Sequence, residues 1–140
     1  MGYAVKLDTN GSFPERLEAL VREKLADRVA MDIKNGPSRY AETVGLRNLD
    51  LSAVTASKDF LLSDAVDYEF RTTVVRGLHT EESLLEAADW IQGAKQWFLQ
   101  QFKDSGDIIG EGLSEYNKEE MEALLDEIRH FVPNAQVRGV

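Results

Sequence analysis

The apolar residues of this chain follow two patterns that alternate along its length. Short runs rich in β-branched and aliphatic residues, which are typical of strands, occur at residues 5–8, 29–34, 68–75, 96–102 and 135–140. Stretches with apolar residues three or four positions apart, which are typical of helices, lie between these runs, with a further short helix predicted near residues 39–43. The alternation of strand and helix predicts an α/β fold with a parallel sheet and right-handed crossovers.

Several helix starts are marked by capping residues. Ser12 is followed three residues later by Glu15, and Asn117 is followed in the same way by Glu120, so both pairs predict a capping box. Thr80 is predicted to cap the helix that follows the third strand, because its hydroxyl can accept a hydrogen bond from a free backbone amide.

Two architectures are compatible with this order of elements. One is an open, doubly wound sheet, and the other is an arc of βα repeats from a TIM-like partial barrel. Periodicity does not separate them, because both bury apolar strands under helices. In both, ligands bind at the carboxyl ends of the strands. We expect a single domain over residues 1–140, with about five strands and four to five helices.

Composition narrows the classes of function. The net charge is −9, from 25 acidic and 16 basic residues, which argues against a nucleic acid as the main partner. The chain has no cysteine and can supply no thiolate for zinc or for an iron–sulfur cluster. No apolar run has membrane-spanning length and no signal peptide is recognisable, so no membrane partner and a cytoplasmic location are expected.

Charged residues inside the first two predicted strands are the strongest sign of a site. Side chains alternate between the faces of a strand, so Lys6 and Asp8 share one face, as do Asp32 and Lys34. Charges inside a buried sheet are unfavourable unless they are paired or face a wet cavity. We therefore predict that these strands form the wall of a ligand site. The alternative is that the two acids only bond to turn amides or cap helices.

The residue types suggest which ligand groups would be bound. Asp8 and Asp32 could hold a hydrated cation, or the ammonium and hydroxyl groups of a ligand. Lys34 and Arg71 could meet a carboxylate or a phosphate. An internal salt bridge from Lys34 or Arg71 to Asp8, Asp32 or Glu69 is the competing interpretation, and we rate it slightly ahead.

The remaining candidates are weaker. Thr9, Asn10 and Gly11 could present backbone amides at a helix start. His79 lies in a loop on the predicted site face, but no nucleophile is recognisable beside it, and we interpret it as a loop residue. We therefore predict no catalytic residue in this chain.

Five short motifs together resemble a known family. They occur in the same order at residues 6–11, 31–34, 70–75, 77–79 and 99–102. In this order they resemble the C-terminal part of radical SAM activating enzymes. The anaerobic ribonucleoside-triphosphate reductase activating protein is the most similar of these, followed by the pyruvate formate-lyase activating enzyme. Each motif is weak by itself, whereas five in register are fairly specific.

The resemblance implies a partial barrel that binds S-adenosylmethionine at its top, cleaves it reductively and abstracts hydrogen from a glycine of a partner enzyme. It places Asp8 and Asp32 near S-adenosylmethionine and a monovalent cation. Lys34 matches the lysine of a D-x-K motif, and Arg71 matches a strand arginine that faces the site. The expected cofactor-binding residues are Asp8, Thr9, Asn10, Asp32, Lys34 and Arg71, with Asp8 and Asp32 as the metal ligands.

The departures from the family matter as much. The C-x-x-x-C-x-x-C loop and the G-G-E-P strand are both missing, and Arg76 stands where the family usually has proline. Without three thiolates the chain cannot hold the four-iron four-sulfur cluster of the full-length enzyme. We predict a C-terminal portion that contributes part of the S-adenosylmethionine site and is inactive alone.

The partner implied by the resemblance is a glycyl radical enzyme. An arc of strands also leaves the edge of its first strand unpaired, which predicts a homo-oligomer through that edge. Two other classes remain open: a non-catalytic, receiver-like signalling or binding module, and a structural interaction domain without a pocket. Receivers carry an acidic pair after the first strand, whereas Asp8 is followed here by Thr9.

Overall fold

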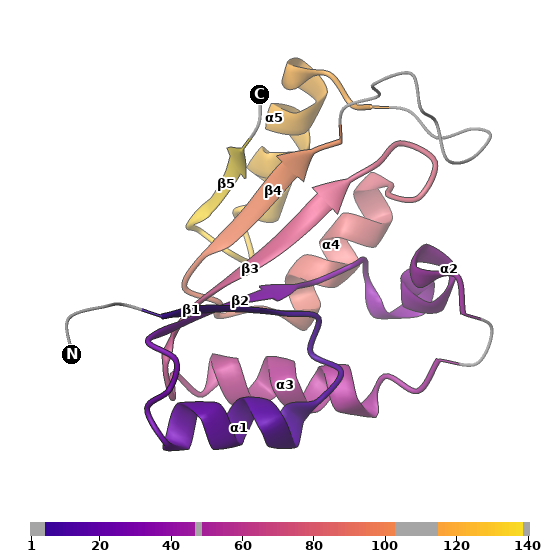
Figure 1. The fold of residues 1–140 in the computed structure, drawn as a ribbon. Helices are drawn as coiled ribbons and strands as arrows, with labels where there is room; N and C mark the ends of the chain where they lie inside the picture. The colour runs from indigo at the N-terminus through magenta and orange to yellow at the C-terminus, as the bar shows by residue number, and fades with distance from the viewer. Residues whose placement is uncertain (1–4, 47–48, 103–114, 139–140) are drawn as a thin grey trace.

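The computed structural model describes residues 5–46, 49–102 and 115–138. Strands and helices alternate as predicted, and no helix in these ranges is long and apolar enough to cross a membrane. In chain order (Figure 1) the elements are β1 (Lys6–Thr9), α1 (Pro14–Arg22), β2 (Arg28–Asp32), the 3₁₀ turn η1 (Pro37–Arg39), α2 (Tyr40–Val44), α3 (Ser52–Leu62), β3 (Asp67–Val74), α4 (Glu81–Trp90), β4 (Trp97–Gln101), α5 (Lys118–Ile128) and β5 (Ala135–Arg138).

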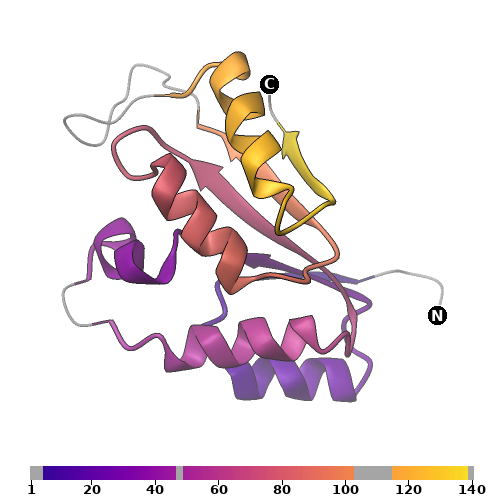
Figure 2. The same cartoon turned by 180° about the vertical axis from the view of Figure 1, so that it is seen from behind.

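The five strands form one parallel sheet whose spatial order is the order of the sequence, β1-β2-β3-β4-β5. Because right-handed crossovers that always step in the same direction place their helices on the same side, the helices cover one face of the sheet, as Figure 2 shows. A doubly wound or receiver-like sheet would instead reverse direction at an inner strand. The strand order therefore identifies an arc of consecutive βα units.

The core lies between the sheet and the helices. Met31 on β2, Phe70 on β3, and Trp97 and Leu99 on β4 point into this layer and are completely buried. The buried hydroxyl of Thr72 accepts a hydrogen bond from the Trp97 indole at 2.9 Å and donates one to the backbone carbonyl just beyond β2 at 2.6 Å. The core thereby holds the carboxyl end of β2 against β3.

Two of the three predicted helix caps are present. Thr80 and Asn117 begin α4 and α5, each with a reciprocal capping box. The box predicted at Ser12 is wrong, because the N-cap of α1 is Phe13, which makes no side-chain hydrogen bond. Ser12 belongs instead to the preceding turn, where its amide donates to Asn10 Oδ1 at 3.0 Å.

The opposite face of the sheet, which Figure 1 presents to the viewer, is mostly polar. We call it the polar face, and it carries every strand residue that alternates with the core residues. Its members are Lys6, Asp8, Arg28, Ala30, Asp32, Asp67, Glu69, Arg71, Thr73, Phe98, Gln100, Gln136 and Arg138.

Candidate functional site

The two acids predicted to border a ligand site lie on the polar face in adjacent rows. Asp8 is the register partner of Ala30, and Asp32 follows Ala30 by two residues on the same face. Asp32 is in turn the register partner of Arg71. The Asp8 side chain is 67% exposed and that of Asp32 is 42% exposed, so neither carboxylate is sealed under packed side chains. Both acids therefore border the same open surface.

Each of these acids has a basic partner. Arg71 Nη2 lies 2.9 Å from Asp8 Oδ1, and Lys34 Nζ lies 3.2 Å from Asp32 Oδ2. These are the internal salt bridges that the sequence offered as the competing interpretation. Exposed ion pairs stabilise a fold by about 1 kcal/mol or less, so a charged ligand group could replace either partner with little loss of stability. The pairs are therefore compatible with ligand binding.

The turn after β1 uses most of its polar groups internally. Thr9 Oγ1 accepts a hydrogen bond from the amide of Gly11 at 3.0 Å, and the amide of Ser12 donates to Asn10. Gly11 has φ +78°, and a Cβ atom there would lie 2.4 Å from the Met31 methyl group. The amides of Gly11 and Ser12 are thus already bonded, and a ligand at this turn would meet side chains first.

A polar cavity lies at the carboxyl ends of β2 and β3. Its volume is about 150 Å³, and three of the predicted site residues line it: Asp32, Lys34 and Arg71. Thr43, Thr73 and His79 complete its polar wall. The cavity therefore brings together one acid and two bases from the end of β2 and from β3.

A second cavity of about 160 Å³ adjoins the first, because Lys34 lines both. Asn10, another predicted site residue, lies in its wall, whereas Asp8 and Thr9 line neither cavity. Apart from Ser12, the rest of the wall is apolar or aromatic and comes from the segment between β2 and α3 and from α3 itself: Tyr40, Val44, Leu46, Leu49 and Val54. Together the two cavities could hold a ligand with a charged end and an apolar end.

His79 and Asn35 fasten the loops around the polar cavity. His79 is 2% exposed, its Nε2 donates to the Lys34 carbonyl at 2.8 Å, and its Nδ1 accepts from the amide of Val75 at 3.0 Å. Asn35 Nδ2 donates to the Leu78 carbonyl at 2.7 Å. Burial lowers the pKa of His79, although its backbone hydrogen bonds oppose the shift. The ring is therefore neutral and has a supporting role.

Glu69 is a buried acid on the same face. It is 1% exposed and lies within ion-pair distance of four cations, Lys6, Arg28, Arg71 and Arg138. Burial by itself would raise the pKa of Glu69, but hydrogen bonds from Arg28 and Lys6 outweigh it, so the pKa lies below its ordinary value. The side chain is therefore ionised at neutral pH.

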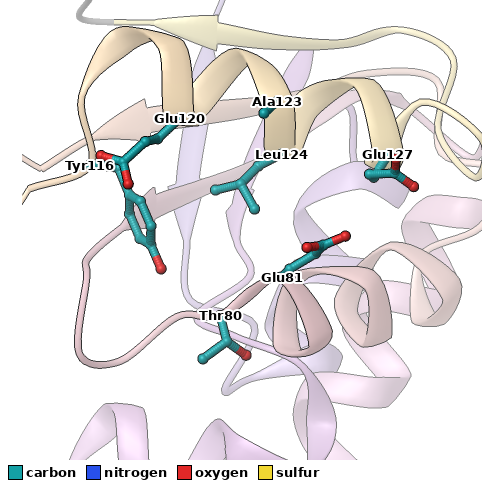
Figure 3. Close-up of a pocket in the computed structure, with 7 residues that line it drawn as sticks. All are labelled: Thr80, Glu81, Tyr116, Glu120, Ala123, Leu124 and Glu127. Atoms are coloured by element: carbon teal, nitrogen blue, oxygen red, sulfur yellow. The ribbon is translucent and has the colours of Figure 1, made fainter.

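A larger hollow of about 480 Å³ lies on the helix side, between the start of α4 and the length of α5. Figure 3 shows Leu124 pointing from α5 toward Glu81 at the start of α4. Among the carboxylates that line this hollow, Glu120 already pairs with Arg76 and caps α5. This hollow lies apart from the polar face and brings no acid and base into a reactive arrangement.

The polar face offers paired acids and bases to a charged ligand. Its charges are paired, and within the described ranges no three metal-binding side chains converge. A cation held by Asp8 and Asp32 would therefore need further oxygen ligands, for example from a bound molecule.

Sequence reasoning missed the second cavity almost entirely. Of its lining residues only Asn10 and Lys34 were predicted site residues, because the apolar wall comes from a segment with no clear period. The contacts of Glu69 were only partly foreseen: alternation put Glu69 beside Arg71, but its other three partners come from other strands.

The chain is similar to two known proteins of one class. A candidate glycyl-radical enzyme activating enzyme of Methanocaldococcus jannaschii is 30% identical over 144 residues, which covers 99% of this chain and 60% of that protein. A crystal structure of a domain of pyruvate-formate lyase-activating enzyme from Bacteroides vulgatus has a TM-score of 0.77 at 12% identity, covering 99% of this chain and 83% of that one. No family model matches the chain.

The similarity to the Methanocaldococcus protein confirms the resemblance to the activating enzymes, and it covers 99% of this chain. The structural match, at 12% identity, shows the shared fold alone. The chain spans about 60% of the length of the Methanocaldococcus protein.

Proposed function

We propose that this chain is the C-terminal portion of a radical SAM glycyl-radical-enzyme activase and contributes part of its S-adenosylmethionine site. The similarity to a glycyl-radical activating enzyme over 99% of the chain supports the class of enzyme. The observation that carries the proposal for the site is the pair of adjoining cavities, one polar and one apolar, that share Lys34.

The two cavities, together with Asp8 and Thr9 outside them, offer groups that would suit S-adenosylmethionine. This ligand has an ammonium group, a carboxylate, ribose hydroxyls, a sulfonium and an apolar aromatic base. Asp8 and Asp32 would accept hydrogen bonds from its ammonium or hydroxyl groups, or share a monovalent cation with it. Lys34 and Arg71 would pair with its carboxylate, Arg71 through its bidentate fork. Thr9 and Asn10 would contact it from the turn after β1.

The four-iron four-sulfur cluster does not fit this chain. The cluster needs cysteine thiolates, and the sequence contains none. We therefore propose that the chain is inactive alone and that another segment supplies the cluster. A coding region that supplies C-x-x-x-C-x-x-C next to this one would support this assembly, and its absence from the genome would contradict it.

The partner of the assembled enzyme would be a glycyl radical enzyme in the cytoplasm, and the net charge of −9 disfavours a nucleic acid in that role. We further propose that the chain self-associates through β1. This strand pairs only with β2 among the described residues, so its other edge has unpaired backbone groups.

Titration with S-adenosylmethionine, followed by amide NMR of the chain, tests the site. We expect saturable shifts of resonances from residues that line the two cavities. Lys34→Met should weaken binding about tenfold, the loss expected for one charge-assisted hydrogen bond. The control is Glu127→Gln, which removes a charge from the hollow on the helix side and should leave the affinity unchanged. Shifts confined to other surfaces, or none at millimolar ligand, would overturn the proposal.

A further inference from the structure

Glu69 links four of the five strands across the polar face. It is the only buried acid among the described residues, and its four cationic neighbours belong to β1, β2, β3 and β5. Ala30 is the register partner of both Asp8 and Glu69. Because its side chain is a single methyl group, Ala30 leaves room above β2 for the longer side chains on either side.

The two carboxylate oxygens of Glu69 have different partners. Oε1 accepts a hydrogen bond from Arg28 Nε at 3.1 Å and lies 3.3 Å from Lys6 Nζ. Oε2 has no hydrogen-bond partner and lies 3.7 Å from Arg138 Nη1 and 4.0 Å from Arg71 Nε. Oε1 therefore fixes the carboxylate to β1 and β2, while Oε2 presents a buried negative charge to the arginines.

Arg71 is held between an exposed acid and a buried one. Its Nη2 reaches Asp8 on the open side, whereas its Nε is buried, has no hydrogen-bond partner and faces Glu69 Oε2. Solvent reaches neither of these two buried atoms, so the negative charge at Oε2 attracts the buried side of Arg71 together with Arg138. The position of Glu69 thus limits the positions that the guanidinium of Arg71 can adopt.

We propose that Glu69 is a positioning residue for the ligand site, which holds the guanidinium of Arg71 where it can pair with Asp8 or with a ligand carboxylate that displaces Asp8. This inference rests on the proposed function, because it takes Arg71 to be a ligand contact. Glu69 itself would not touch the ligand, since it lies beneath the arginines.

The first test needs no ligand. The side-chain Nε–H signals of the arginines are recorded by NMR for the wild-type chain, for Glu69→Gln and for Glu69→Asp. Glu69→Gln should shift the Arg71 signal and speed its exchange with water about tenfold or more, the change expected when a charged partner is lost. Glu69→Asp should restore part of the protection, because it keeps the negative charge, and it provides a second variant if the neutral one does not fold. An Arg71 signal unchanged in both variants would overturn the proposal.

The second test compares S-adenosylmethionine affinities in a double-mutant cycle with Arg71→Met. Glu69→Gln should weaken binding in the wild-type background and cause no further loss in the Arg71→Met background, because Glu69 acts through Arg71. If Glu69 had only a general structural role, Glu69→Gln would weaken binding equally in both backgrounds. That result would contradict the proposal and leave the proposed function intact.

The control for both tests is Glu81→Gln, an exposed charge on the helix side, which should change neither the arginine signals nor the affinity. If the wild-type chain does not bind S-adenosylmethionine, the proposed function fails at that step. The exchange of the Arg71 Nε–H then decides by itself whether Glu69 positions the guanidinium.

Discussion

His79 fixes two loops of the candidate site through hydrogen bonds to the backbone. Its ring is buried, and both nitrogens are engaged by backbone groups, one on Lys34 beyond β2 and one on Val75 at the end of β3. This pattern requires the neutral tautomer with the proton on Nε2. The position of Lys34, which lines both cavities, therefore depends on the protonation state of a residue in a different loop.

The stability of the chain should depend on pH through His79. Burial lowers the pKa of this ring below its ordinary value of 6.5. As the pH falls through 6.5, His79 binds a proton in the unfolded chain but not in the folded chain. The contribution of His79 to stability is therefore complete above pH 6.5 and is lost as the pH falls toward the pKa of the folded chain. We expect the free energy of unfolding in urea to decrease from about pH 7.5 to about pH 5.5, and to decrease less in His79→Gln. Equal slopes for the two proteins would contradict this assignment.

Gly11 should tolerate substitution worse than a glycine with the same backbone angle elsewhere. Gly11 and Gly45 both have φ +78°, but a Cβ atom at Gly45 would meet nothing within 4 Å, whereas one at Gly11 would overlap Met31. Gly45→Ala should reduce the free energy of unfolding by about 1 kcal/mol, from backbone strain alone. Gly11→Ala should reduce the free energy of unfolding by about 1–3 kcal/mol more than Gly45→Ala does, because the added Cβ atom overpacks the core.

Chemical unfolding of the two alanine variants measures the difference. Similar losses would mean that Met31 moves aside freely and that the turn after β1 is packed less tightly than the structure shows.

At the scale of elements, the starts of the helices show how a local signal can be present and yet unused. Ser12 and Thr80 both stand before an amphipathic helix, but only Thr80 becomes the N-cap. Ser12 is drawn into the turn that Asn10 closes, and Pro14 begins the helix without a side-chain cap. Competition between two local hydrogen-bonding patterns therefore decides where a helix begins.

Substituting Thr80 and Ser12 individually by alanine should distinguish the real N-cap from the apparent one. Thr80→Ala should reduce the free energy of unfolding by about 1 kcal/mol, because the amide of Ser83 loses its acceptor. Ser12→Ala should change it by less than about 0.5 kcal/mol. Thermal or urea unfolding measures both, and a loss at Ser12 as large as that at Thr80 would show that α1 is capped in solution by the box that the sequence predicts.

At the scale of the whole molecule, the order of the strands has two consequences. Within the described ranges it places α1, α3, α4 and α5 on one face and leaves the polar face open, so charged groups from several strands can gather there. It also leaves β1 at an edge of the sheet among the described residues. An unpaired edge next to an exposed apolar residue, Val5, favours association with another strand.

We predict that the chain self-associates through this edge. A second lysine immediately before β1, introduced by Val5→Lys, should weaken the association on the order of tenfold, about 1.4 kcal/mol. The matched control is Leu46→Lys, because Leu46 is similarly exposed but lies beyond α2. Sedimentation equilibrium measures the association, and a wild-type chain that stays monomeric at high concentration would contradict the prediction.

Part of the candidate site could be predicted because it depends on alternation along single strands. That rule put Asp8, Asp32 and Arg71 on one face, and the structure places them in adjacent rows. It could not give the partners of Glu69 or the apolar wall of the second cavity, which depend on the register between strands and on an irregular segment.

The sequence by itself determined the alternation of strands and helices, the face on which each strand residue lies and the lack of thiolates for a metal cluster. These properties depend on residue type and on spacing within one segment. Only the tertiary structure decided the strand order, the pairing of Arg71 with Asp8 and the burial of Glu69 among four cations. The physical reason is that each of these depends on contacts between residues far apart in the chain, which local periodicity does not record.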